Sequence, residues 1–391
     1  MENKFLAEAK AIAPYLEEIY AQLHSHPELG RQEYQTQALI LAELEKMGIE
    51  ACTIADTGVV GLIRGSKPGK TVAFRADMDA LPIEETADVP YKSQNPGVMH
   101  ACGHDSHVTI LLGLAKIMST KKAELSGNIK LLFQPDEEGR GGAKRMIEEG
   151  CMDNPHVDGV FYSHCSPGNP SGTISSRFGA VNAASNTYAV TFRGKGTHGA
   201  SPHLGTDAIV AASSAVMALQ TIASRRVGPT DSVVVTVGQF EAGSAPNIIP
   251  ETATIKGMIR TLNPKTREQA KNDFRQIING VAATMNVEVD IDLREGYCAS
   301  VNDDDMTRLT RAAAAKVLGE ENVRTTANPS MGTEDFGYFL QTAPGCYFNY
   351  GVGKPGADNK PVHNPGFKVD LDALPYGAAV YAQIAEDFLS E

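Results

Sequence analysis

The sequence predicts an α/β protein of about two domains, and three observations predict this fold class. The chain has 391 residues, more than one ordinary hydrophobic core accommodates. Short apolar runs alternate with helical patterns in its first part, as in a sheet covered by helices. Around residue 184 this pattern changes, and after Tyr297 it resumes. We therefore expect a discontinuous first domain, over 1–183 and 297–391, and an insert over 184–296.

The first segment is expected to open with helices. Residues 4–23 carry apolar side chains at helical spacing, with a kink or a new helix start at Pro14. A second helix is expected at 34–47. Further elements are expected as strands at 59–63, 71–74, 129–133 and 159–162, and as helices near 108–118 and 142–149. Polar residues follow several of these strands, and open α/β sheets place their sites at the carboxyl ends of strands.

The insert carries a pattern of its own. Strands are expected at 188–192, 232–237, 252–259 and 287–291, and helices at 206–222 and 266–285. This β-α-β-β-α-β order is that of a ferredoxin-like sandwich. The first domain then resumes with a helix near 306–318, a strand near 346–350 and a final helix at 374–389.

Composition and charge exclude several classes of protein. The chain is 42% hydrophobic and 21% charged, as in globular enzymes. Its net charge of −12 is offset by no basic stretch, so no nucleic-acid partner is expected. No secretory signal and no apolar run near the ~20 residues of a membrane span are visible, so no membrane partner is expected. The six cysteines form no CxxC pair, so no structural zinc knuckle or disulfide framework is expected. Most are expected to be small buried side chains in a reducing cytoplasm.

Two adjacent glutamates, Glu137 and Glu138, follow the apolar run 131–133. A Glu-Glu pair usually lies at the solvated start of a helix, where acids interact favourably with the helix dipole. Here the glycines at 139, 141 and 142 favour a tight strand-to-helix turn that presents side chains into a cleft. A pair of divalent metals would explain both acids, with one as a ligand and the other handling a proton.

Cysteine and histidine residues at other segment ends complete a candidate ligand set. Cys102 and His104 precede an apolar helix, His164 follows an apolar run, and His363 stands in a proline-rich loop. Alone, Cys102 would be a buried cysteine near a helix cap. A nucleophilic Cys-His pair is a third interpretation. It is disfavoured because nearby glutamates raise the pKa of a thiol unless a metal is present.

The sequence resembles metallopeptidase family twenty, in the branch of aminoacylases, hippurate hydrolases and indole-acetyl-amino-acid hydrolases. The matching segments run in order along nearly the whole chain: 24–29, 75–82, 99–105, 134–139, 164–167, 196–203, 245–250, 332–336 and 363–365. The resemblance implies a zinc-peptidase catalytic domain of the phosphorylase/hydrolase-like type, with an inserted ferredoxin-like lid or dimerisation domain.

The resemblance also implies roles for single residues. The metal ligands would be Cys102, His104, Glu138, His164 and His363. Glu137 would be the general base and His198 a second catalytic residue. Asn247 and Arg260 would bind substrate. The H-x-D motif of the wider family stands here as Asp77-Met78-Asp79, so we interpret Asp77 and Asp79 as groups that orient ligands.

The function expected from these features is metal-dependent hydrolysis of the amide bond of N-acyl amino acids, with Glu137 as the base that deprotonates a metal-activated water. Two divalent ions are expected, manganese or zinc, with cobalt and nickel as further candidates. A dipeptidase or carboxypeptidase using the same centre is the alternative, and a non-catalytic metal-binding homologue is less favoured. The expected partners are a small N-acyl amino acid or short peptide and further copies of the chain, as a homodimer or higher oligomer. The expected location is cytoplasmic.

Overall fold

The computed structural model describes residues 2–390, which form two compact units. Unit 1 comprises the chain up to Gly179, Val301–Ala327, and the chain from Asp335 onward, and unit 2 comprises Ala180–Ser300 and Asn328–Glu334. The sequence prediction had assigned 328–334 to the first domain.

The segment Asn328–Glu334 belongs to unit 2 because its backbone pairs there. Ser330 forms an isolated β-bridge with Asn182. The N–H group of Ala183 donates to the carbonyl oxygen of Gly332 at 2.9 Å. Such pairing depends on residues far apart in the sequence, so no local pattern predicts it.

Unit 1 contains an eight-stranded mixed sheet, which establishes the α/β class. Its strands, in spatial order, are β1 (Glu50–Ile54), β2 (Gly58–Arg64), β4 (Ser126–Gln134), β3 (Lys67–Asp77), β5 (Gly159–Pro170), β16 (Gly345–Gly353), β6 (Ile174–Ser176) and β15 (Val323–Thr325). Strand β3 runs parallel to both β4 and β5, and β5 runs parallel to β16. The carboxyl ends of β3, β4 and β5 therefore lie at one edge of the sheet.

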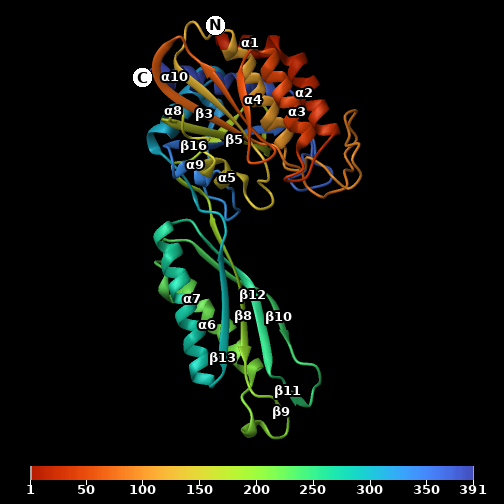
Figure 1. Ribbon diagram of the computed structural model, residues 1–391, viewed down its shortest axis with the longest axis vertical. Helices are drawn as coiled ribbons and strands as arrows, with labels where there is room; N and C mark the ends of the chain where they lie inside the picture. Colours follow the sequence, from red (N-terminus) through yellow and green to blue (C-terminus); the bar gives the residue numbers. More distant parts are fainter. Residues whose placement is uncertain (1, 391) are drawn as a thin grey trace. The chain divides into compact units, whose positions relative to one another are not determined.

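Helices cover both faces of this sheet (Figure 1). They are α1 (Lys4–Ala11), α2 (Ala13–Ser25), α3 (Tyr34–Lys46), α4 (His104–Ser119), α5 (Gly142–Glu148), α8 (Asp304–Leu318), the 3-10 turn η3 (Glu320–Asn322), α9 (Gly337–Leu340) and α10 (Ala373–Ser390). On one face α4 and α10 pack together, with α1 and α8 against α10 and α2 against α4, while α5 and α9 pack together on the other. Helix α4 is buried along almost its whole length, which explains its continuous apolar sequence.

Most predicted elements are present, with corrections at their ends. The predicted break near Pro14 is confirmed, since α1 ends at Ala11 and Pro14 stands in the first turn of α2. Helix α4 begins at His104 instead of 108. Strand β5 continues past His164, because its ladder with β16 extends beyond that residue. His164 therefore lies within a strand, and its predicted place at a strand end was wrong.

Unit 2 contains a four-stranded antiparallel sheet and two long helices. Its elements are β8 (Ala184–Arg193), α6 (Ala208–Thr221), the π-helical turn η2 (Ile222–Arg226), β10 (Val233–Ala242), β12 (Thr252–Thr261), α7 (Pro264–Met285) and β13 (Glu288–Glu295). The spatial order β10-β12-β8-β13, with one helix in each crossover, is the β-α-β-β-α-β arrangement predicted from the sequence. Its separate apolar core includes Phe274, whose ring centre lies 4.5 Å from that of Tyr188.

Short elements complete the chain. Strand β9 (Thr197–His198) pairs with β11 (Ile248–Ile249), β7 (Gly179–Asn182) pairs with β14 (Ser300–Asn302), and the 3-10 turn η1 covers Pro202–Leu204. The sequence analysis predicted none of them, because two- to four-residue strands carry too little periodicity to be recognised.

One helical stretch of the described chain is long and apolar enough, by length and composition, to cross a membrane. This stretch, Ala208–Arg226, corrects the expectation that no such run exists. Small alanines make it apolar, and four of them, at 208, 211, 212 and 215, are fully buried in the core of unit 2. The core helix of a soluble protein can have the same length and apolar composition, so this stretch is only weak evidence for a membrane span.

Candidate metal centre

The start of helix α4 brings the first two candidate ligands into unit 1. Cys102 precedes the helix, Gly103 is its N-cap and His104 its first residue. Gly103 has a φ of 81°, and a Cβ atom there would lie 2.5 Å from the sulfur of Cys165. Only glycine combines this backbone conformation with so close an approach. The turn therefore fixes Cys102 and His104 side by side.

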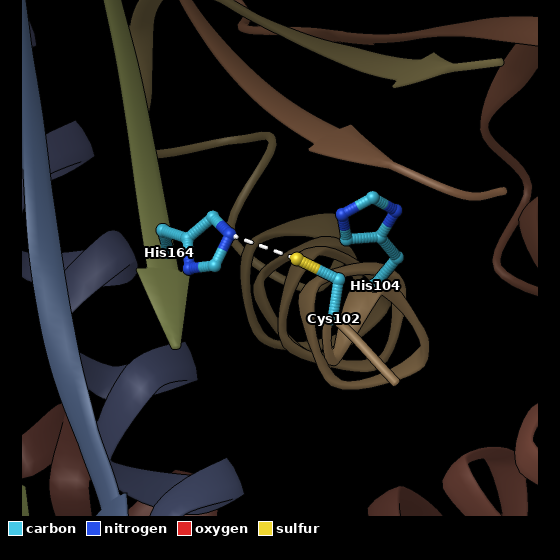
Figure 2. A group of neighbouring side chains, drawn as sticks. All are labelled: Cys102, His104 and His164. Atoms are coloured by element: carbon cyan, nitrogen blue, oxygen red, sulfur yellow. Dashed lines mark hydrogen bonds between the residues drawn. The ribbon is translucent and has the colours of Figure 1, made fainter. Parts of the chain in front are cut away.

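Cys102, His104 and His164 form the first group of candidate ligands (Figure 2). The Cys102 sulfur lies 3.4 Å from Nε2 of His164, which projects from β5. One ligand atom from each of the three residues lies within 4.8 Å of the others.

The other predicted ligands join this group through shared members. Cys102, Glu138 and His363 form a second group with the same 4.8 Å separation, and His104, Glu137 and Glu138 form a third. The glutamates stand in the turn after β4. His363 Nε2 lies 3.0 Å from Oε1 of Glu138. The five predicted ligands and Glu137 thus form one cluster, which we call the metal cluster, although their roles stay predictions.

Hydrogen bonds orient two of the imidazole rings toward this cluster. His104 Nδ1 donates to the backbone oxygen of Asp79 at 2.8 Å, and His164 Nδ1 donates to the backbone oxygen of Cys165 at 2.8 Å. Because a carbonyl oxygen only accepts, both Nδ1 atoms carry a proton, and Nε2 is the atom of each ring left to bind a metal ion. Among the described residues, His104 Nε2 is buried without a hydrogen-bond partner, and Oδ2 of Asp77 lies 3.4 Å away. A metal ion bound to this Nε2 atom would supply the partner that it lacks.

Asp79 contacts two candidate ligands at once. Its backbone oxygen and Oδ1 face Nδ1 of His104, and its Oδ2 accepts the backbone N–H of Glu138 at 3.0 Å. These contacts agree with the predicted orienting role, since such groups fix ligand geometry in metalloproteins.

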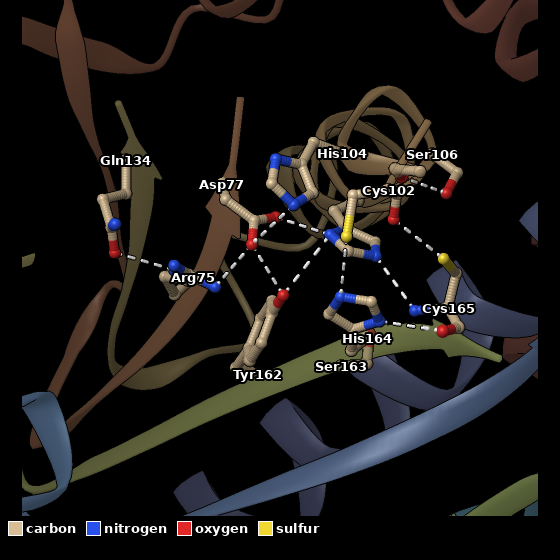
Figure 3. Close-up of polar contacts among 12 residues, drawn as sticks. Arg75, Asp77, Cys102, His104, Ser106, Gln134, Tyr162, Ser163, His164 and Cys165 are labelled. Atoms are coloured by element: carbon tan, nitrogen blue, oxygen red, sulfur yellow. Dashed lines mark hydrogen bonds and ion pairs between the residues drawn. The ribbon is translucent and has the colours of Figure 1, made fainter. Parts of the chain in front are cut away.

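Asp77 lies in a fully buried network beside the cluster (Figure 3). Its Oδ2 accepts from Nη1 of Arg75 at 2.8 Å and from the Tyr162 hydroxyl at 2.7 Å, and its Oδ1 lies 2.5 Å from Nδ1 of His107. Burial opposes ionisation of Asp77, but Arg75, His104 and His107 outweigh it and lower its pKa well below the usual range. The same Oδ2 lies 3.4 Å from Nε2 of His104.

The sequence analysis did not identify Arg75, His107 and Tyr162 as site residues. His107 stands three residues after His104 on the same helix face, which was the one available signal. Its Nε2 accepts the backbone N–H of Cys165 at 3.0 Å, beside His164. Arg75 and Tyr162 join the site through contacts with residues distant in the sequence, and no local sequence pattern predicts such contacts.

The electrostatics of the cluster call for a cation. Burial and then Glu138 raise the pKa of the Cys102 thiol well above its usual value. Burial lowers the pKa of His104, but Asp77, Asp79 and Glu138 outweigh this effect and raise it to about 10. Without a metal ion, the thiol keeps its proton mainly because it is buried, and the imidazole keeps a second proton because carboxylates surround it. Sulfur, nitrogen and carboxylate donors of this kind fit zinc, manganese, cobalt or nickel.

The same surroundings disfavour a nucleophilic Cys102. A cysteine nucleophile needs a lowered pKa, whereas burial and acidic neighbours raise this one. Its position among histidine and glutamate side chains fits a ligand that a metal ion would deprotonate.

Three predicted site residues lie in unit 2 and are described within that unit. His198 is exposed, on β9, which pairs with β11. Asn247 is its neighbour in space, because its backbone oxygen accepts the N–H of Gly199 at 2.7 Å. Arg260 stands on β12, and its Nη1 is buried without a hydrogen-bond partner in the described chain.

Comparison with known proteins identifies the family. The sequence model of peptidase family M20/M25/M40 matches residues 73–387, and the chain belongs to this family. The chain is 40% identical over 393 residues to thermostable carboxypeptidase 2 of Saccharolobus solfataricus, covering 99% of this chain and 98% of that protein. It is 39% identical over 398 residues to IAA-amino acid hydrolase ILR1-like 2 of Arabidopsis thaliana, covering 100% and 89% of the two chains.

Solved structures agree with this assignment. The YXEP protein of Bacillus subtilis, described as a dinuclear metal-binding peptidase of the M20 family, superposes with a TM-score of 0.85 at 30% identity, covering 97% of this chain and 99% of that one. Members of this family are metal-dependent hydrolases that act on amide bonds, and this chain is an enzyme of that class.

Proposed function

We propose that the protein hydrolyses the amide bond of N-acyl amino acids with a pair of divalent metal ions. The metal cluster carries the proposal, because it places two adjacent carboxylates among sulfur and nitrogen donors. The Arabidopsis relative, named as a hydrolase of an amino-acid conjugate, supports this substrate class. The Saccharolobus relative, named as a carboxypeptidase, favours the alternative that the same centre cleaves a peptide.

In this proposal, separate residues of the chain bind the metal ions, transfer the proton and orient the ligands. The metal ions would be held by Cys102, His104, Glu138, His164 and His363. When bound, such a pair supplies Lewis acidity that acidifies water and polarises a carbonyl oxygen. Glu137 accepts a proton from the attacking water and then delivers it to the leaving amine. Asp77 and Asp79 hold the ligand side chains in place.

Unit 2 would contribute a lid in this proposal. His198 would donate a hydrogen bond to the developing oxyanion, and Asn247 would hold the same end of the substrate. Arg260 would pair with the substrate carboxylate, and its partnerless Nη1 supports this role. The exposed position of His198 leaves its ring accessible to a ligand.

Substrate preference tests the function itself. The purified chain, stripped of metal with a chelator, is incubated with manganese or zinc and a panel of N-acetyl amino acids, N-benzoyl amino acids and dipeptides. We expect metal-dependent hydrolysis with the highest kcat/KM on an N-acyl amino acid. Faster cleavage of the dipeptides would support the alternative, and activity that survives chelation would contradict a metal-dependent reaction.

Mutations of the two adjacent glutamates should have different effects on metal content and activity. Glu137→Gln preserves side-chain shape but cannot accept a proton, so we expect normal metal content and a loss of about 10²–10⁴-fold in kcat. Glu138→Ala should lose metal and activity together, because a ligand is removed. Metal analysis and steady-state rates measure both effects, with exposed Glu148→Gln as the matched control. A Glu137→Gln enzyme with normal turnover would refute the mechanism.

His198 should act without binding metal. His198→Ala is expected to lower kcat by about 10²–10³-fold at unchanged metal content, since one oxyanion donor is lost. His203→Ala is the control, because His203 is exposed in the same segment. Equal rates for the two variants would make His198 an ordinary surface residue.

We also propose that the chain forms a homodimer through unit 2. Several apolar side chains are exposed there, among them Met217 on α6 and Val234 and Phe240 on β10, an edge strand of its sheet. Light scattering of the full chain at micromolar concentration should give twice the monomer mass, and a strict monomer would contradict this proposal. The cytoplasmic location stays a prediction.

A further inference from the structure

His24 is a buried histidine that the proposed chemistry does not use. It stands in the last turn of α2, in the segment His24–Leu29 that the sequence analysis singled out, and is 2% exposed. A titratable side chain at such depth needs partners, and those it has lead toward the metal cluster.

Both ring nitrogens of His24 meet buried carboxylates. Nδ1 lies 2.6 Å from Oδ2 of Asp105, and Nε2 lies 3.1 Å from Oε1 of Glu85. Because ionised carboxylates only accept, each nitrogen donates and the ring is an imidazolium. Burial alone would lower the pKa of His24, but the bonds to Asp105 and Glu85 outweigh it and raise the pKa to about 9. The ring is therefore charged at neutral pH.

Aromatic residues fix the plane of this imidazolium. The ring of Tyr20 stacks on it with the centres 5.5 Å apart, and Tyr91 meets it edge-on at 5.3 Å. The Tyr20 hydroxyl also lies 3.3 Å from Nδ1. Held in this way, the ring can direct its two N–H groups along only one pair of directions.

Each carboxylate belongs to a segment next to a candidate ligand. Asp105 follows His104 directly, and its Oδ1 accepts the N–H of Ser106 at 2.8 Å in the first turn of α4. The residue after Glu85 is Thr86, whose N–H donates to the backbone oxygen of Pro365 at 2.8 Å, two residues beyond His363. The imidazolium thus bridges the segment that carries His104 and the loop that supports the His363 segment.

We propose that His24 is a positioning residue of the metal cluster: by binding Asp105 and Glu85 together, it fixes the spacing of His104 and His363. This inference rests on the proposed metal centre. A preorganised site binds metal more tightly than one whose ligands must be gathered, so removing the bridge should weaken metal binding.

A purely structural role predicts a different result. A buried ion pair that lost one partner would destabilise the fold whether or not metal is bound. Metal affinity and ligand geometry would then stay as in the wild type. Three measurements therefore distinguish a positioning role from a purely structural one. They are the metal affinity, the spectrum of a bound cobalt ion and the rise in melting temperature that metal causes.

The test compares His24→Gln with His26→Gln in the full chain. Gln carries no charge, and its two N–H groups share one nitrogen, so it cannot reproduce the charged bridge between two ring nitrogens. His26 is exposed, and its ring hydrogen-bonds to Ser25 and Gln22. For His24→Gln we expect manganese or zinc affinity about tenfold lower by calorimetry. We also expect a shifted cobalt absorption spectrum and a smaller metal-induced rise in melting temperature. His26→Gln should match the wild type.

His24→Lys provides the rescue, because it keeps a cation with several donors, and its metal affinity should lie between those of His24→Gln and the wild type. If His24→Gln does not fold, Glu85→Gln replaces it, since it keeps the side-chain shape and removes one charge of the bridge. Weaker metal binding is expected for it as well.

Unchanged affinity and cobalt spectrum in the folded variant, with only a lower melting temperature, would overturn the inference and leave the metal centre intact. A wild-type chain that binds no metal would overturn both the centre and the positioning role.

Discussion

The crowding of anionic groups at one buried point is the constraint on which the rest of this site depends. Glu137 and Glu138 lie beside a buried thiol and a histidine whose pKa is raised to about 10 by its acidic neighbours. Burial of such groups is unfavourable unless a cation compensates them. The fold meets part of this demand with its own cations, since Arg75 and the His24 imidazolium each bind two buried carboxylates. The remaining charge fits a pair of divalent ions.

The architecture explains how these groups come together. Parallel pairing places the ends of β3 and β4 at one edge of the sheet, and β5, which carries His164, runs beside β3. Helix α4 begins at the same place because Gly103 adopts a left-handed conformation there. The site is thus built on strands and a helix start, while His363 comes from a loop whose backbone is tied to Ala101 by a hydrogen bond. Rigid elements hold the candidate ligands in overlapping groups whose ligand atoms lie within 4.8 Å of one another.

The sequence predicted what local patterns and motif order encode. Hydrophobic periodicity gave the main strands and helices and the arrangement of unit 2, and the spacing of Cys102, His104, Glu137 and Glu138 indicated metal chemistry. It did not predict features that arise from contacts between distant residues. The buried network of Arg75, Tyr162 and His107, the bridge formed by His24 and the place of 328–334 in unit 2 all depend on tertiary pairing. His164 was misplaced because β16 extends the ladder of β5 beyond the apolar run.

The most direct test of this account is the number of metal ions that the cluster binds. Elemental analysis of the full chain, reconstituted with manganese or zinc and freed of excess metal, should give two ions per chain. Cys102→Ala should hold fewer, because a residue that belongs to two of the candidate ligand groups is removed. A wild-type chain that retains no metal, or a Cys102→Ala chain that retains the full complement, would contradict the claim that this anionic cluster is a dinuclear metal centre.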